Sequence, residues 1–141
     1  MPKRNAEAVW HGDLKTGNGT MKLGSGAYEG MYSFDTRFED GVGSNPEELI
    51  GAANAGCLSI ALSAGLAGAG YSPQSVETHA EVDLKKTDDG FSIDSITLDC
   101  KANIPNISEE DFQKHAEDAK KGCPVSKALT GVKINLNARL T

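Results

Sequence analysis

Residues 45–70 read NPEELIGAANAGCLSIALSAGLAGAG, and this stretch decides how the rest of the chain is organised. Asn45 is suited to cap a helix, Pro46 suits the first helical position, and Glu48 follows at the spacing of a capping box. The apolar pattern then continues to about Ala69. The stretch predicts a helix of roughly 24 residues, about 36 Å long, that runs through a core and lets another backbone approach closely.

The same stretch raises the alternative of a membrane span, because no charged residue occurs from Leu49 to Val76. Asn54, Ser59, Ser63 and five glycines dilute the apolar character, and few large apolar side chains are present to favour insertion. We therefore expect a buried central helix and no membrane partner.

The rest of the chain alternates between strand and helix patterns. Short strands and a polar loop over 35–45 precede the long helix, and two longer strands, two helices and a last strand follow it. This order predicts one α+β domain over 1–141, without an internal repeat or a linker. The expected elements are strands over 7–12, 20–23, 31–34, 76–84, 91–104 and 132–140, a bulge near Asp94, and helices capped by Ser108 and beginning at Pro124.

Composition and charge exclude several classes of protein. A chain of 141 residues is long enough to bury a core. A net charge of −6 argues against a nucleic-acid surface and against binding to an anionic membrane. The first residues lack the apolar segment of a signal peptide, and three cysteines do not suit a secreted disulfide scaffold. A cytoplasmic location is expected.

Cys123 lies where one helix pattern stops at Gly122 and the next begins at Pro124. The free N–H groups and the positive dipole end of a helix stabilise a thiolate at such a capping position and lower its pKa. Two interpretations remain open: a chemically active thiol, or a small hydrophobic residue that caps the helix.

Cys57 lies about three turns inside the long helix, where burial raises the pKa of a thiol and makes it inert. A structural cysteine is the simpler interpretation unless a cation is held beside it. Arg37 is the nearest candidate in sequence, and Glu47 can hold its guanidinium in a bidentate fork. The alternative is a solvated loop arginine and an ordinary acidic residue at a helix start.

Glu47 and Cys57 are ten residues apart, which is about 15 Å along a straight helix, so their side chains cannot touch within one chain. Glu47 would act through Arg37 or come from a second chain, and a helix of small residues suits pairing with its own copy. Cys100 shares the phase of the apolar residues in its strand and is expected in the core. The three histidines lack the spacing of a zinc site.

Four segments together closely resemble the OsmC/Ohr family, and its osmotically induced OsmC branch in particular. The resemblance covers nearly the whole chain. The segments are TRFE at 36–39, SNPEELIGAA at 44–53, GC at 56–57 and KGCPVS at 121–126.

This resemblance implies a thiol-dependent peroxidase that reduces organic hydroperoxides, and hydrogen peroxide less well, in oxidative and osmotic stress defence. It implies antiparallel sheets around long central helices, in an intertwined homodimer with active sites at the subunit interface. Cys57 would be the peroxidatic cysteine and Cys123 the resolving one, with Arg37 and Glu47 as the catalytic pair. An external dithiol would reduce the Cys57–Cys123 disulfide, and no metal, flavin or haem is required.

Two other functions are considered. A non-catalytic stress protein of the same fold would bind a small apolar ligand, and its function would survive loss of the Cys57 thiol. A protein disulfide exchanger would carry an exposed Cys-X-X-Cys motif, which this sequence lacks.

Overall fold

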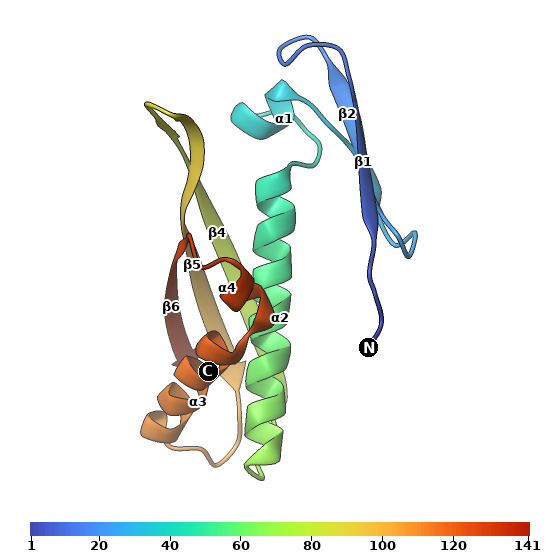
Figure 1. The fold of residues 1–141 in the computed structure, drawn as a ribbon. Helices are drawn as coiled ribbons and strands as arrows, with labels where there is room; N and C mark the ends of the chain where they lie inside the picture. Colours follow the sequence, from blue (N-terminus) through green and yellow to red (C-terminus); the bar gives the residue numbers. More distant parts are fainter. The chain divides into compact units, whose positions relative to one another are not determined.

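The computed structural model describes residues 1–141, which form two compact units, Met1–Leu49 and Ile50–Thr141. The structure is of the α+β class, as the sequence predicts (Figure 1). The first unit contains β1 (Ala6–His11), β2 (Asn18–Leu23), β3 (Glu29–Tyr32) and α1 (Phe34–Phe38). Helix α2 (Pro46–Gly68) starts in this unit, and the second unit continues with β4 (Ser75–Thr87), β5 (Gly90–Asn103), α3 (Glu109–Gly122), α4 (Pro124–Ala128) and β6 (Lys133–Leu140).

Helix α1 occupies part of the segment that was expected to be a strand followed by a loop. Ser33 Oγ accepts a hydrogen bond from the Thr36 N–H at 3.3 Å, and Thr36 Oγ1 accepts one from the Ser33 N–H at 2.8 Å. These reciprocal bonds satisfy free N–H groups at a helix start, so the chain turns after β3 into a helix. The predicted strand end at residue 34, and the loop predicted from residue 35, are therefore wrong.

The first unit has a three-stranded antiparallel sheet, in the order β1-β2-β3, with little apolar burial. The rings of Trp10 and Tyr32 pack on each other with centroids 5.3 Å apart, but both remain partly exposed. The buried residues of this unit are Gly19, Thr36, Ser44 and Glu47. None of them is a large apolar residue, so the unit lacks a hydrophobic core of its own.

The hydrophobic core lies in the second unit. Leu58, Leu62 and Leu66 line one face of α2, with at most 1% of each residue exposed. They pack in one cluster with apolar residues of β5 and α3, and Figure 1 shows α2 running alongside the β4-β5-β6 sheet. Cys100 is fully buried in this cluster, which confirms its predicted place in the core.

The sheet of the second unit is mixed. In the antiparallel pair of β4 and β5, Asp83 lies opposite Ser95 and Leu84 lies opposite Ile93. Asp94 is therefore the extra residue of a bulge, as the change of phase in the sequence predicts. Strand β6 pairs parallel to β5, because α3 and α4 carry the chain back before β6 begins. The expectation of antiparallel sheets is therefore wrong for the β5–β6 pair. It is confirmed for the other strand pairs, all of which are antiparallel.

The start and packing of α2 follow its sequence closely. Asn45 Oδ1 accepts a hydrogen bond from the Glu48 N–H at 2.8 Å, which confirms the predicted cap. Gly51 lies against β4, where an added Cβ would be 3.1 Å from Val82 Cγ2. The glycine therefore lets helix and strand approach closely, as expected for this small-residue helix.

Helix α2 is not buried on all sides in the single chain, which corrects the expectation of a fully buried central helix. It is long and apolar enough to cross a membrane by length and composition, and 28% of its most apolar window is buried. Ile60 is 70% exposed. The exposed small and apolar residues of this face are Ala52, Ala53, Gly56, Ile60, Ala64 and Ala67.

Candidate active site

Cys123 lies at the junction of two helices, as the sequence predicts. It ends α3 and caps α4, and Pro124 occupies the first position of α4. Its N–H donates to the Ala119 carbonyl at 2.9 Å, and the whole residue is buried. The end of α3 therefore fixes the backbone of Cys123, while its side chain makes no capping hydrogen bond to the start of α4.

The fold brings Cys57 of α2 to Cys123, although the two residues are far apart in the sequence. Both are free thiols, Cys57 half-buried and Cys123 buried. The two thiols lie close enough for each to shift the pKa of the other, and the N–H of Val125 acts on the pKa of both. Two thiols in direct contact are placed to form a disulfide.

The pKa values of the two thiols are shifted in opposite directions. Burial raises the pKa of Cys57, and donation of its S–H to Cys123 raises it further, against a smaller opposing effect of the Val125 N–H. Burial also acts to raise the pKa of Cys123, but the donors from Cys57, Ser126 and Val125 outweigh burial and lower it. Within the second unit, Cys123 is thus the thiol that ionises first, as its capping position predicts.

Arg37 and Glu47 form an ion pair within the first unit. Arg37 Nε and Nη2 both donate to Glu47 Oε1, at 3.0 and 2.8 Å. The expected fork across both carboxylate oxygens is wrong, because Glu47 Oε2 is buried and has no hydrogen-bond partner. The guanidinium also lies over the Phe38 ring, 5.2 Å from its centroid. This arrangement orients the cation and leaves Nη1 for a further acceptor.

Asn45 holds the two segments that carry this ion pair. Its Nδ2 donates to the Thr36 carbonyl at 3.1 Å, while its Oδ1 caps α2 at Glu48. One side chain therefore ties the end of α1, which carries Arg37, to the first turn of α2, which carries Glu47. Neither residue is a freely solvated side chain in this structure.

Two polar residues near the cysteines were not singled out from the sequence. Asn54 precedes Cys57 by three positions on α2 and is fully buried, and neither its Nδ2 nor its Oδ1 has a hydrogen-bond partner. An unpaired buried amide costs about 1–3 kcal/mol. Ser126 follows Cys123 by three positions and has a buried Oγ. The sequence held one signal for each residue. Asn54 is the one amide in a largely apolar helix, and Ser126 lies three positions after the helix cap at Cys123.

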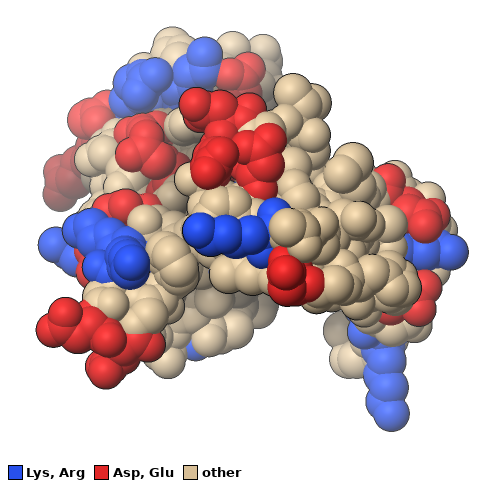
Figure 2. Space-filling view, turned by 90° about the horizontal axis from the view of Figure 1, so that it is seen from above, with Lys and Arg blue, Asp and Glu red and all other residues tan.

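Lysines gather around the junction of α3 and α4. Residues 119–133 include four lysines and no acidic residue, in a chain whose net charge is −6. Three of them line an open cavity of about 240 Å³ beside Ser126. Charges of both signs are interspersed on the face shown in Figure 2.

No group of three or more His, Cys, Asp or Glu side chains is placed to hold a metal ion.

Comparisons with known proteins identify the family and the fold of this chain. A family model described as OsmC-like protein matches residues 39–137. Peroxiredoxin OsmC of Escherichia coli (strain K12) is 46% identical over 127 residues, which cover 89% of each chain. Organic hydroperoxide resistance protein-like 2 of Staphylococcus epidermidis is 35% identical over 66% of this chain and 65% of its own. The crystal structure of an organic hydroperoxide resistance protein from Elizabethkingia anophelis has a TM-score of 0.74 at 25% identity, covering 97% of this chain and 96% of its own.

Proposed function

The chain belongs to the OsmC-like protein family, and we propose that it reduces organic hydroperoxides as a thiol-dependent peroxidase, with Cys57 attacking and Cys123 resolving. The observation that carries this proposal is the direct contact of two free thiols in the second unit. The names of the related Peroxiredoxin OsmC and hydroperoxide resistance protein support the substrate class.

In the first step, the Cys57 thiolate attacks one oxygen of the hydroperoxide. A sulfur–oxygen bond forms as the oxygen–oxygen bond breaks, and the departing alkoxide takes up a proton to become an alcohol. Cys57 is thereby oxidised to a sulfenic acid. Hydrogen peroxide would undergo the same step and release water.

The next steps return the enzyme to its dithiol form. Cys123 attacks the sulfenic sulfur of Cys57 and forms a disulfide, and the hydroxide that leaves becomes water on protonation. An external dithiol then reduces the disulfide by thiol–disulfide exchange. One turnover consumes one hydroperoxide and one dithiol, and the cycle uses no electron carrier other than these thiols.

Cys57 needs a cation for the first step, because Cys123 ionises before it within the second unit. We assign this cation to Arg37, held by Glu47. A guanidinium favours a thiolate and can also donate to the peroxide oxygen under attack. The ion pair of Arg37 with Glu47 and the remaining Nη1 donor support this assignment. The pair can act from the same chain or from a partner subunit.

A second copy of this chain is the partner that the exposed surfaces favour. The first unit buries no large apolar residue, and α2 exposes a face of small and apolar residues that includes Gly56 and Ile60. Such a face lets two identical helices approach closely around a twofold axis. A homodimer would cover the apolar face of α2 in water, in keeping with a cytoplasmic location. Light scattering in detergent-free buffer should give the mass of a dimer, whereas protein that dissolves only with detergent would indicate a membrane instead.

The activity test uses cumene hydroperoxide and a dithiol reductant. We expect the wild type to consume the hydroperoxide catalytically and Cys57→Ser to lose this activity. Circular dichroism of both proteins controls for folding. Equal rates for the two proteins would overturn the proposal and favour a non-catalytic protein that binds a small apolar ligand.

A further inference from the structure

Ser126 is placed to act on Cys123 in the resolving step, an inference that rests on the proposed function above. We propose that Ser126 is a positioning residue whose hydroxyl donates a hydrogen bond to the Cys123 thiolate as that thiolate attacks the Cys57 sulfenic acid. Cys123 caps α4 and Ser126 is the third residue of that helix. The Cys123 N–H already donates to the Ala119 carbonyl, so the two residues form no capping box and the Ser126 hydroxyl is not engaged by the cap backbone.

The Ser126 hydroxyl has no competing partner. Its Oγ is buried and makes no hydrogen bond in the reduced protein. The Ser126 hydroxyl and the Ser126 N–H are nevertheless among the groups that lower the pKa of the Cys123 thiol. A buried hydroxyl without a partner is unfavourable, and a hydrogen bond to a charged sulfur removes this penalty. Because the hydroxyl hydrogen can rotate, the bond can form without movement of the backbone.

Oxidation of Cys57 removes another donor from Cys123. In the reduced protein, the Cys57 thiol is one of the groups that lower the pKa of Cys123. The sulfenic acid no longer carries the S–H of this thiol, and its sulfur is the atom that Cys123 must attack. Apart from the O–H of the sulfenic acid, whose oxygen is the leaving group, the donors that remain at Cys123 are the N–H groups of Val125 and Ser126 and the Ser126 hydroxyl. Ser126 thus supplies a side-chain donor at the stage when the Cys57 donor has been lost.

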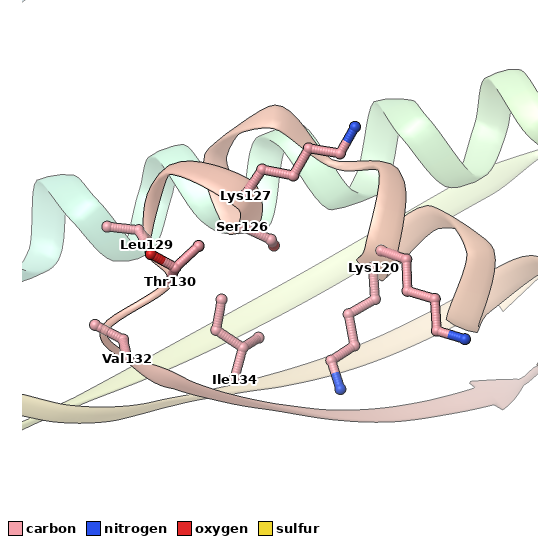
Figure 3. A pocket seen from close by; sticks show the side chains of 8 residues that line it. Lys120, Ser126, Lys127, Leu129, Thr130, Val132 and Ile134 are labelled. Carbon is pink, nitrogen blue, oxygen red and sulfur yellow. The ribbon is translucent and has the colours of Figure 1, made fainter.

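The surroundings of Ser126 favour this role. Figure 3 shows Ser126 on α4 above a cavity, with Val132 and Ile134 on the other side. Leu129 adds to this apolar lining, and Thr130 carries the one other hydroxyl in it. The charged groups of the lining are Lys120, Lys121 and Lys127, and the titratable group in contact with Cys123 is Cys57 of α2. In the proposed site, Arg37 adds a positive charge near Cys57.

The chemistry of the step balances without a further reactant. The hydroperoxide has already oxidised Cys57 to the sulfenic acid, as proposed above. The lone pair of the Cys123 thiolate forms the sulfur–sulfur bond, the sulfur–oxygen bond of Cys57 breaks, and hydroxide leaves with the electron pair and is protonated to water. Ser126 keeps its proton throughout. It increases the fraction of Cys123 that is ionised, which sets the rate near neutral pH.

The test follows the lifetime of the Cys57 sulfenic acid after one equivalent of cumene hydroperoxide. Dimedone quenching and intact mass spectrometry separate the sulfenic acid from the disulfide at each pH. Ser126→Ala should slow disulfide formation about tenfold at neutral pH and move its pH midpoint up by about one unit, because one pKa unit is a tenfold change in thiolate. The rate at which the sulfenic acid forms should not change. Ser126→Thr should restore the wild-type profile.

Ser59→Ala is the matched control, because this partly buried hydroxyl of α2 bonds to Thr78 Oγ1 at 2.8 Å instead of to a cysteine. In Ser59→Ala, the rate and the pH midpoint of disulfide formation should equal those of the wild type. An unchanged rate and midpoint in Ser126→Ala would overturn the inference. If this variant fails to fold, Ser126→Thr and Ser126→Val provide the comparison, and equal midpoints for these two would also overturn it.

A separate measurement distinguishes failure of this inference from failure of the proposed function. In reduced protein carrying Cys57→Ser, the ultraviolet absorbance of the thiolate reports the pKa of Cys123 without any peroxide. Addition of Ser126→Ala should raise this pKa, and no change would contradict the role of Ser126. A wild type that forms no sulfenic acid would instead contradict the peroxidase proposal, whatever this titration gives.

Discussion

Arg37 and Glu47 meet at a single carboxylate oxygen. Nε and Nη2 of Arg37 donate to Glu47 Oε1 at 3.0 and 2.8 Å, while Oε2 stays buried without a partner. The carboxylate thus orients one edge of the guanidinium, and Nη1 can serve a second negative group. This geometry is compatible with the role proposed for Arg37, a cation that assists a thiolate while one of its donor groups stays available.

Arg37→Lys should slow the oxidation of Cys57 by about tenfold or more, because loss of one charge-assisted hydrogen bond is worth about 1.5–3 kcal/mol. A lysine keeps the charge but cannot span Glu47 and a second acceptor with a rigid fork. Stopped-flow measurement of sulfenic acid formation reports this step separately from resolution. A wild-type rate in Arg37→Lys would show that charge alone suffices.

Arg37→Ala should raise the pKa of Cys57, because in the proposed site Arg37 is the cation beside this thiol and its removal disfavours the thiolate. The measurement is a thiolate absorbance titration in Cys123→Ser, where the second site thiol is absent. Arg4→Ala is the control, since this residue is an exposed arginine near the start of the chain. If Arg37→Ala leaves the midpoint at its original pH, Arg37 does not act on Cys57.

Leu58→Ala should lower the free energy of unfolding by about 2–5 kcal/mol, because the truncation leaves a cavity in the core of the second unit. Leu58 has no exposed surface, whereas the control Leu14→Ala changes a residue that is 55% exposed. The control should change stability by less than about 0.5 kcal/mol. Urea unfolding followed by circular dichroism measures both, and equal losses would contradict the assigned core.

Ile60→Glu should convert the proposed homodimer into monomers, because it places a charge in the exposed apolar face of α2. Ile60 is 70% exposed in the single chain, so the substitution removes little packing within the subunit. Light scattering after size exclusion gives the mass, with Val42→Glu at a residue 98% exposed as the control. A dimer that persists in Ile60→Glu would place the interface elsewhere.

Local signals account for the elements that the sequence predicts well. Asn45 caps α2, and Cys123 caps α4 before Pro124, because both features depend on a few neighbouring residues. The bulge at Asp94 follows from the change of phase along one strand. These features need no knowledge of the distant chain.

The remaining features depend on contacts that local pattern does not encode. Ser33 and Thr36 form a reciprocal cap that starts α1 and ends the strand before it. The strand and turn preferences of these residues alone did not predict this helix. The parallel direction of β6 depends on how far α3 and α4 return the chain. The contact of Cys57 with Cys123 joins α2 to the α3–α4 junction, so the sequence could offer it as a hypothesis only.

The most direct measurement is intact mass spectrometry of the reduced protein after one equivalent of cumene hydroperoxide. The wild type should lose two hydrogen atoms as Cys57 and Cys123 form a disulfide. Cys123→Ser should instead gain one oxygen atom, located on Cys57 by peptide mapping, and Cys57→Ser should remain unmodified. Oxygen found on Cys123 in Cys57→Ser, together with an unmodified Cys123→Ser, would reverse the two roles and contradict the account.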